Sequence, residues 1–550
     1  MKLLKLDYIF FLIIFIFSLL FSSELFLHTG RPATFDANIH ISTMAQFGDV
    51  LKSGEFPVVW LNNFANYGLP TGMYTHQVSN YLGGFINIFL QNPVLTYNLL
   101  IFSSIFFSSL FLYLFLRLYF KPESSLLGTF ILCFSQFRIF DVYVRGALPE
   151  VFSSMLLPLI LISIYYFIVK RKNLSFFSLS ILTTILSLTH PMMLVVNSLL
   201  FFLYIVYLLL EKSSPIKEKA KLFIASILSM LLGFLISMYY FLPLNLEIKY
   251  FYEGLTKNHL IDTTFLSFQN YFGISSDYFQ RGGMVQFGLA GTIILIISLF
   301  YYIYKRLKKT NENLKMLEFV LVSSAIVIYF TTPLSKIFYD KLFFLNSLQF
   351  PYRFLSDLIF LPPIALSFLY ERFPRKIIFL TIIISVGFLS FTQIYGKNFT
   401  YYPNSSYYSE KENPNSIMMN TIWIGKTEDY PARTTQGKII EGKGQITSEV
   451  IKNSERQYVV DASTSVKMVD YTFYFPGWTV YIDGQKTNIE FQDPKYRGVI
   501  TYNVPSGKHS ILVKFEDTKI RQLGKVLTLI FSGVFILLFI FRKRLFKLLP

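Results

Sequence analysis

An apolar segment near the start of the chain, DYIFFLIIFIFSLLFSSELFL at residues 7–27, leads into the polar stretch TFDANIH at residues 34–40. About twenty apolar residues are long enough to cross a bilayer as a helix, so the polar stretch should lie at a membrane surface. Asp36 and His40 are four residues apart and would share one face of a helix. Charged groups in such a position are costly without a partner or a function. We therefore expect the rest of the chain to build a cavity around Asp36.

The composition is that of a polytopic α-helical membrane protein. The 550 residues are 53% hydrophobic and 18% aromatic, and only 15% are charged, whereas soluble proteins carry about 25% charged residues. The apolar residues occur in blocks of roughly twenty. The net charge of +17 could suggest nucleic acid, but the basic residues form short clusters between apolar blocks, which is the pattern that orients spans. The expected partner is thus the lipid bilayer and no nucleic acid.

The apolar blocks predict about twelve transmembrane helices. The predicted spans cover approximately residues 7–27, 94–117, 124–140, 150–169, 174–190, 191–210, 221–243, 285–304, 316–333, 354–371, 377–394 and 522–541. Residues 1–395 would form the multi-span membrane domain, with an outer loop at 28–93. Residues 522–550 would form the last transmembrane helix and a basic cytoplasmic tail.

Clusters of Lys and Arg predict the orientation, because cytoplasmic connections carry the excess of positive charge. With twelve spans these clusters all fall on one side, including Lys170-Arg171-Lys172 and Arg542-Lys543-Arg544 near the end of the chain. The prediction is a multi-pass protein of the cell membrane with both termini cytoplasmic. The outer loop would then be extracytoplasmic, with Trp60 in the aromatic belt at the membrane surface.

Residues 396–521 differ in composition from the membrane domain and are rich in Tyr, Thr, Lys and Asn. β-prone runs such as Tyr458-Val459-Val460 alternate with tight-turn signals such as Asp483-Gly484. Short runs of this kind are typical of antiparallel β structure. This segment is predicted to be a β-sandwich-like domain on the extracytoplasmic side, between the last two spans.

Asp36 with His40 has two interpretations that the residues alone do not separate. A carboxylate beside an imidazole at the outer surface suits a general base or a metal ligand. Asp is also a favoured helix N-cap, and Asp36 precedes a predicted short amphipathic helix that runs to Leu51. The two roles can coexist, because a helix N-terminus stabilises a carboxylate in its charged form.

Arg138, Asp141, Arg145 and Glu150 lie in another outer connection or one turn inside its span. Guanidinium groups stay charged in low-dielectric sites and bind phosphate bidentately, so the two arginines could clamp a lipid phosphate. The alternative is a salt-bridged loop in which the two acids neutralise the two arginines. The position at the ends of membrane spans favours the clamp, because charges there tend to be functional.

Two weaker candidates lie in other outer connections. Gln349-Phe350-Pro351-Tyr352-Arg353 places an arginine at the mouth of a span, either as a second phosphate contact or as an interfacial anchor. His190 precedes Pro191 and is more simply a hydrogen-bonded helix cap than a ligand.

The sequence lacks the common catalytic and nucleotide-binding motifs: it has no glycine loop for phosphate, no nucleotide fingerprint, and no HExxH, paired CxxC or GxSxG motif. Their absence disfavours a nucleotide-driven pump.

Several of these residues together resemble a known family. They run from Asp36 and His40 through Gly54-Glu55-Phe56-Pro57 to Arg145-Gly146-Ala147-Leu148-Pro149-Glu150 and Leu348-Gln349-Phe350-Pro351-Tyr352-Arg353. This pattern resembles the bacterial membrane proteins with a "6-pyruvoyl-tetrahydropterin synthase-related domain", a historical label that implies no pterin chemistry. The tail, with Phe475-Pro476-Gly477-Trp478, is similar to the outer β domain of YfhO-like membrane proteins.

The resemblance implies the GT-C superfamily of integral-membrane glycosyltransferases, which use a polyprenyl-phosphate-linked sugar at the outer face of the membrane. An acidic residue in the first outer loop usually serves there as base or metal ligand, and Asp36 matches that position. Asp36 is followed by Ala37-Asn38 in place of the two-acid DxD spacing. No cofactor is therefore firmly implied, although a divalent metal, Mg²⁺ or Mn²⁺, is compatible with the resemblance.

The leading hypothesis is a glycosyltransferase that moves a sugar from a polyprenyl-phosphate donor to a glycan, lipid or protein acceptor of the cell envelope. Asp36 would deprotonate the acceptor hydroxyl beside His40, and Glu150 would orient an arginine or assist at the acceptor. The predicted substrate-binding residues are Arg138, Asp141, Arg145, His190, Gln349, Tyr352 and Arg353. The alternative is a non-catalytic lipid- or glycan-binding or transport protein of envelope assembly.

Reporter fusions test the predicted orientation. Alkaline phosphatase, which folds only outside the cytoplasm, should be active when fused after residue 60 and inactive when fused after residue 172. A cytoplasmic reporter such as green fluorescent protein should show the reverse pattern. Fluorescence from the fusion after residue 60 would contradict the orientation.

Overall fold

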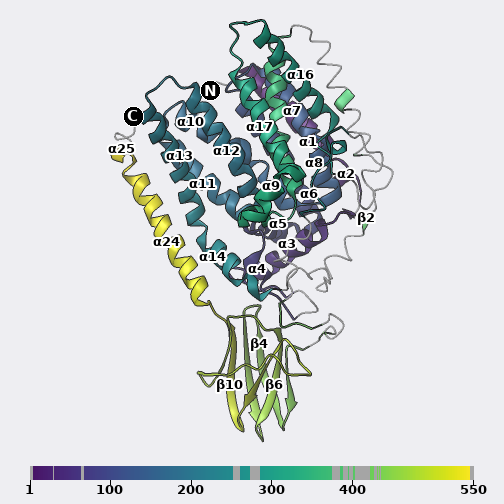
Figure 1. Ribbon diagram of the computed structural model, residues 1–550. Helices are drawn as coiled ribbons and strands as arrows, with labels where there is room; N and C mark the ends of the chain where they lie inside the picture. Colours follow the sequence, from purple (N-terminus) through teal and green to yellow (C-terminus); the bar gives the residue numbers. More distant parts are fainter. Residues whose placement is uncertain are drawn as a thin grey trace.

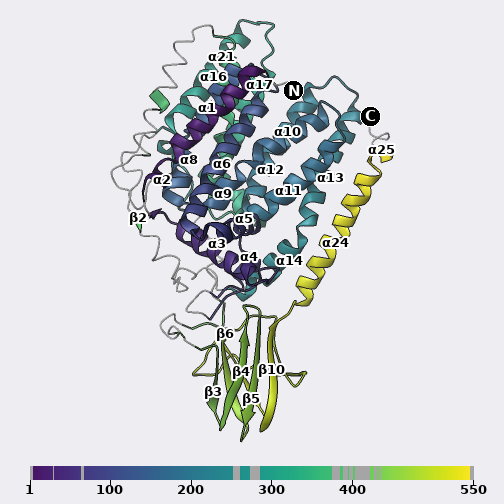
Figure 2. The same cartoon turned by 180° about the vertical axis from the view of Figure 1, so that it is seen from behind.

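The computed structural model describes most of the chain. The described residues are 4–28, 30–62, 67–251, 261–272, 285–373, 385–387, 394, 401–402, 421–425, 430, 433 and 435–545. They form a helical domain and a smaller β domain, which lies against one end of the helices (Figure 1). The chain termini lie at the opposite end of the helical domain, as the view from behind also shows (Figure 2).

Among the described residues, eight helices are long and apolar enough to cross a membrane, or up to ten if each of two bent pairs is one span. The eight are α1 (Lys5–Ser22), α6 (Pro93–Leu116), α9 with α10 (Leu148–Ile168), α12 (Pro191–Glu211), α13 (Ile216–Ile236), α16 (Leu289–Leu307), the span Pro351–Tyr370 that ends in α21 (Leu361–Tyr370), and α24 (Lys519–Ile540). The bent pairs are Pro122–Cys133 (α7) with Gln136–Arg145, and Lys315–Thr331 (α17) with Pro333–Lys341.

Most of the predicted spans coincide with these helices. The predicted spans 124–140 and 316–333 correspond to the bent pairs, which turn by 44° and 80° at their breaks. The predicted span 174–190 corresponds to α11 (Leu174–Thr189), an apolar helix of 16 residues. The predicted span 377–394 lies outside the described residues except for 385–387 and 394. The total of twelve spans therefore stays a prediction.

The spans differ in how much of their surface other parts of the protein cover. The apolar window of Pro351–Tyr370 is fully buried, so other parts of the protein cover this span on all sides. In contrast, only 6% of the apolar window of α24 is buried. It packs along one side against α13 and α14 (Met238–Glu247). A helix that is apolar all round and largely uncovered is suited to contact with lipid.

The connection 28–93, predicted above to be the outer loop and called so below, contains helices between the spans and the β domain. They are α3 (Ala37–Lys52), α4 (Thr71–Tyr74) and α5 (Gln77–Leu90). The predicted amphipathic helix after Asp36 is thus confirmed as α3. It lies close against α5, where a Cβ atom added to Gly84 would be 2.8 Å from the Cβ atom of Phe47. Shorter helices elsewhere include α2 (Glu24–Leu27), α15 (Gln269–Phe272), α18 (Lys336–Lys341), α19 (Phe343–Asn346), α20 (Leu355–Leu358) and α25 (Arg542–Leu545).

The predicted β-rich region is confirmed over residues 437–515 as two antiparallel sheets, whereas most of residues 396–434 lie outside the described part of the chain. Its strands are β3 (Gly437–Glu441), β4 (Gly444–Ile451), β5 (Glu455–Ala462), β6 (Val466–Phe473), β7 (Trp478–Ile482), β8 (Gln485–Thr487), β9 (Val499–Val504) and β10 (Gly507–Phe515). One sheet has the order β4-β5-β10-β7-β8 and the other β3-β6-β9. Alternate residues of β5, such as Tyr458 and Val460, are buried in a core that also contains Met468 and Tyr502 of the other sheet. The sheets therefore pack face to face as a sandwich.

A buried acid joins the two domains. Glu247, at the end of α14, accepts hydrogen bonds from Arg521 Nε at 3.0 Å, from Thr518 Oγ1 at 2.7 Å and from the Tyr74 hydroxyl. Arg521 also donates to the carbonyl of Pro476 at 2.7 Å. The guanidinium at the start of α24 therefore connects the helical domain with the loop before β7.

A second acid contributes to the same junction. Glu55 accepts hydrogen bonds from the backbone and side chain of both Asn453 and Ser454, at 2.6–3.0 Å. Burial alone would raise the pKa of Glu55, but the hydrogen bonds from Ser454 and Asn453 hold it below its usual range. The carboxylate therefore remains charged and fixes the outer loop to the turn between β4 and β5.

Trp60 also belongs to this junction, so its predicted place in an interfacial belt is wrong. Its side chain is fully buried, with its ring 5.0 Å from Trp478 and 5.3 Å from Phe515. Gly68 covers it so closely that a Cβ atom there would be 2.1 Å from the indole nitrogen. The tryptophan is buried because the β domain covers it, which composition near a span end does not reveal.

The Glu247–Arg521 pair should matter for stability. Because both side chains are buried, Glu247→Ala leaves an unpaired guanidinium and should lower the free energy of unfolding by about 3–5 kcal/mol. Thermal unfolding of the detergent-solubilised protein measures the effect. Asp517→Asn, which removes the exposed partner of Lys525 in the same region, should cost about 0–1 kcal/mol. Equal effects of the two substitutions would contradict the role of the buried pair.

Candidate functional site

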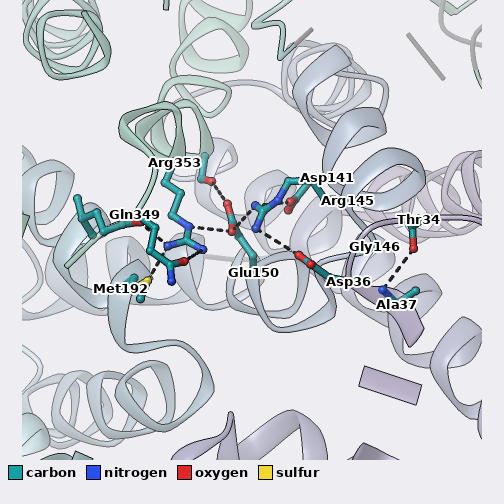
Figure 3. A network of polar contacts seen from close by, with 12 residues as sticks. Thr34, Asp36, Ala37, Asp141, Arg145, Gly146, Glu150, Met192, Gln349 and Arg353 are labelled. Atoms are coloured by element: carbon teal, nitrogen blue, oxygen red, sulfur yellow. Dashed lines mark hydrogen bonds and ion pairs between the residues drawn. The ribbon is translucent and has the colours of Figure 1, made fainter. Parts of the chain in front are cut away.

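Arg145 is the centre of a network of charged side chains (Figure 3). Its Nη1 donates to Glu150 Oε2 at 2.6 Å and to Asp141 Oδ1 at 3.2 Å. Its Nη2 lies 3.6 Å from Asp36 Oδ2. One guanidinium thus contacts three carboxyl groups, two tightly and one loosely.

Arg353 contacts the same network from a distant part of the chain. Its Nε donates to Glu150 Oε2 at 3.3 Å, and its Nη2 donates to Gln349 Oε1 at 3.3 Å. Its Nη1 contacts Met192 Sδ at 2.5 Å and donates to the carbonyl of Leu348. Glu150 therefore bridges the two arginines, and the guanidinium of Arg353 is held by contacts on all of its nitrogens.

The local backbone explains why Asp36 lies beside Arg145. Residues Phe140–Arg145 form a short π-helix, a geometry that is frequent at functional sites. It ends at Gly146 with φ of 69°, and a Cβ atom there would be 2.3 Å from Thr34 Oγ1. The Asp36 amide donates to the carbonyl of Arg145 at 2.7 Å. Glycine thus permits the close approach that brings the start of α3 to the end of the π-helix.

Aromatic rings cover the arginines on another side. The ring of Phe350 lies 5.6 Å from the guanidinium carbon of Arg145 and 5.1 Å from that of Arg353. Tyr352 lies 5.8 Å from Arg145. The rings of Phe350 and Tyr352 add cation–π attraction and exclude water from the guanidinium groups. Separately, Ser356 donates a weak hydrogen bond to Glu150 at 3.5 Å.

Exposure separates Asp36 from the other charged members of the site. Asp141, Arg145, Glu150 and Arg353 are buried, whereas the side chain of Asp36 is 35% exposed. Partial burial raises the pKa of Asp36, and the attraction of Arg145 opposes that rise. Asp36 is thus the carboxyl group that a ligand can reach.

Three of the six histidines form a row beside this network. The rings of His40 and His76 are 6.1 Å apart, and those of His76 and His190 are stacked at 4.7 Å. Burial lowers the pKa of His40 to about 3, with a further contribution from Arg145. Burial, His40 and Arg353 lower the pKa of His76 to about 3. Both imidazoles are therefore neutral at physiological pH.

The structure brings together most of the residues that the sequence suggested. Asp36, Asp141, Arg145, Glu150, Gln349, Tyr352 and Arg353 meet in the network, and His40 and His190 lie in the adjacent row. The side-chain contact of Arg138 is instead with Ser109 at 3.4 Å. Within the described part of the chain, no three His, Cys, Asp or Glu side chains are arranged to hold a metal ion.

The helix-cap interpretations of Asp36 and His190 have different outcomes. Asp36 occupies the N-cap position of α3, but its side chain makes no capping hydrogen bond. Thr34 Oγ1 instead accepts a bond from the Ala37 amide at 3.3 Å. His190 does cap α12, because its Nδ1 accepts a bond from the Met193 amide at 3.3 Å. The carboxylate of Asp36 is therefore available for Arg145.

Sequence reasoning missed His76, the middle histidine of the row. It lies in the same outer loop as Asp36 and directly precedes α5, as His190 directly precedes α12. This position directly before a helix was the signal in the sequence that could have identified His76. Its proximity to His190, which is 114 positions later in the chain, could not be read from spacing.

A comparison with protein families identifies the region around this site. Residues 74–400 match the model of the 6-pyruvoyl-tetrahydropterin synthase related domain, described as a membrane protein. The chain belongs to this family of membrane proteins. His76, Arg145, Glu150 and Arg353 lie inside the matched region, whereas Asp36 precedes it. A comparison with curated proteins finds no match.

The two acids that contact Arg145 should differ in their effect on stability. Glu150→Gln removes the negative charge that two buried arginines share and should cost about 3–5 kcal/mol. Asp36→Asn removes one loose and partly exposed contact and should cost about 0–1 kcal/mol. Thermal unfolding in detergent measures both. A larger loss for Asp36→Asn than for Glu150→Gln would contradict the assignment of Glu150 as the bridging group.

Proposed function

We propose that the protein is a membrane glycosyltransferase that uses a polyprenyl-phosphate-linked sugar, with a GT-C-like membrane domain. The observation that carries the proposal is the meeting of Asp36, Arg145, Glu150 and Arg353 in one network. They come from three separate parts of the chain, and one of them remains partly exposed. A reachable carboxylate beside two guanidinium groups suits a reaction that needs a base and an anionic leaving group.

In the proposed reaction, the carboxylate of Asp36 takes the proton of an acceptor hydroxyl. The acceptor oxygen forms a bond to the anomeric carbon of the sugar. The bond from that carbon to the phosphate oxygen breaks, and the electron pair leaves with the polyprenyl phosphate. Arg145, supported by Arg353, stabilises the negative charge that develops on the phosphate.

Glu150 has a positioning role in this proposal. Its Oε2 accepts hydrogen bonds from both arginines, and the residue is only 2% exposed. A buried carboxylate with two cationic partners is a poor proton acceptor for a substrate. Of its two predicted roles, the geometry therefore favours orientation of the arginines over direct assistance at the acceptor.

An apolar cavity in the helical domain suits the hydrocarbon tail of the donor. It has a volume of about 260 Å³ and lies between α11, α13 and α24, with Ile185, Ile236 and Phe535 in its wall. Ile185 is about one helical turn from Thr189, at the end of α11 beside His190. A lipid whose head group reaches the arginines could place part of its chain in this cavity.

The sidedness of the site and of the β domain is part of the proposal. The β domain lies at the end of the helical domain that also carries α3 and α4, and the termini lie at the other end (Figures 1 and 2). With the termini in the cytoplasm, the β domain and the outer loop are extracytoplasmic. We infer that the β domain positions a cell-envelope acceptor above the site.

A second candidate is a lipid or glycan carrier that binds without turnover. The many contacts that Arg145 and Arg353 already make within the protein favour this reading, because salt-bridged arginines can be structural. The release of free polyprenyl phosphate from a polyprenyl-phosphate sugar separates an enzyme from a carrier.

Substitution of Asp36 tests the proposed function. Purified protein with a polyprenyl-phosphate sugar and envelope glycan should release polyprenyl phosphate, and Asp36→Asn should lower the rate about 10²–10⁴-fold because the base is lost. Arg145→Lys should also reduce the rate, because a lysine cannot make the bidentate contact.

Asp7 offers a matched control for this experiment. It is a buried aspartate that pairs with Arg117 at 2.8 Å, at the other end of α1. Asp7→Asn removes a comparable charge without touching the site and should leave the rate per folded molecule unchanged. Release that is equal in wild type, Asp36→Asn and Asp7→Asn would reject Asp36 as the base.

A further inference from the structure

One buried ring nitrogen in the row of histidines has no hydrogen-bond partner among the described residues. Within the described part of the chain, the buried Nδ1 atom of His76 has no hydrogen-bond partner, whereas the ring interacts with the backbone of Thr189. A neutral imidazole that donates to a carbonyl through one nitrogen keeps a free lone pair on the other. His190 differs, because its Nδ1 accepts from the Met193 amide. His76 thus has a buried ring nitrogen that can accept a proton.

The groups around His76 explain why it carries no proton in the free protein. His40 lies on the α3 side and His190 on the α12 side, and the charges of Arg353 and Asp36 act on the ring in opposite directions. Burial and the positive charge of Arg353 both disfavour an imidazolium. Asp36 would favour one, but it is paired with Arg145 at 3.6 Å. The protonation state of His76 therefore depends on whether Asp36 pairs with Arg145 or with His76.

The contact between Asp36 and Arg145 is the one that an incoming anion would replace. It is the longest contact of Arg145 with an acid and the only one with an exposed partner among the described residues. An anion on Arg145 Nη2 would leave Asp36 without its guanidinium partner and would add negative charge to the site. Both changes favour a proton on a neutral base of the site such as His76.

We propose that the site binds an anionic phosphate group together with one proton, which His76 takes up while Asp36 moves from pairing with Arg145 to pairing with the His76 imidazolium. The proposal rests on the anion-binding half of the proposed function and does not require turnover. It makes His76 a positioning residue that holds Asp36 away from the occupied arginine. The proton comes from solvent, so binding is accompanied by net proton uptake.

The expected size of the effect follows from Coulomb's law. One negative charge about 4 Å from an imidazole, at the effective dielectric of a protein site, should raise the pKa of His76 from about 3 to about 6. His76 is neutral in the free protein at pH 6 and would be about half protonated in the complex. At pH 8 it would be neutral in both states. Proton uptake through His76 should therefore be about half a proton at pH 6 and close to zero at pH 8.

Calorimetry measures this uptake directly. A polyprenyl phosphate is titrated into the full-length protein in detergent, at pH 6 and pH 8, in two buffers with different ionisation enthalpies. The difference between the buffers gives the number of protons bound per complex. His76→Phe keeps a ring that can stack on His190 but removes the base, and it should lose about half a proton of uptake at pH 6. The protonation of the phosphate itself is common to both proteins and cancels in the comparison.

Two further variants make the result decisive. His76→Gln removes the base and places no aromatic ring at this position, and it should give the same proton uptake as His76→Phe. If one of the two variants fails to fold, the other still tests the role of His76. His509→Gln, in the β domain and paired with Asp483, removes a histidine remote from the site and should behave as wild type. Binding with equal proton uptake in wild type and both His76 variants would overturn this proposal and leave the proposed function intact. No binding by the folded wild-type protein would overturn both.

Discussion

A guanidinium group inside a membrane domain must be paired, because an isolated charge in a low-dielectric interior is costly. Arg145 satisfies this condition with Glu150 and Asp141 at 2.6 and 3.2 Å, and Glu150 extends the pairing to Arg353. These contacts join the π-helix, the start of α9 and the first residues of the buried span Pro351–Tyr370. The outer loop then completes the arrangement by placing Asp36 on the remaining nitrogen. The position of every part of the candidate site thus depends on how this one charge is neutralised.

The contacts around Arg145 are unequal, and this inequality is what makes the cluster suitable for a ligand. A network in which every charge is tightly held is a structural element, and most of this network has that character. The contact with Asp36 differs because it is long and partly exposed. Arg145 Nη2 therefore has a partner, Asp36, that a ligand can replace. The neutral histidines beside it add a proton acceptor without adding a competing positive charge in the free protein.

The need to pair buried charges also determines the contacts at the junction between the domains. Glu247 and Arg521 form a buried pair between α14 and α24, and Glu55 accepts four hydrogen bonds from the turn before β5. Both acids come from the helical domain, and apart from Tyr74 the partners described above come from the β domain or the segment that follows it. The β domain is therefore held in a definite position over the outer loop, and Trp60 is buried in the contact. An acceptor bound by the β domain would be presented to a fixed site.

The membrane class, most spans, the helix after Asp36 and the β region were predictable from the sequence, because they depend on hydropathy and periodicity over short windows. The grouping of Asp36, Arg145, Glu150 and Arg353 was predicted from charges at span ends and from a family resemblance, without their contacts. Only the tertiary structure decided that Arg138 points to Ser109, that Trp60 is buried, and that His76 stacks on His190. These outcomes depend on which helices are neighbours. A long-range contact is set by the packing of the whole domain, so no local pattern around Arg138, Trp60 or His76 contains it.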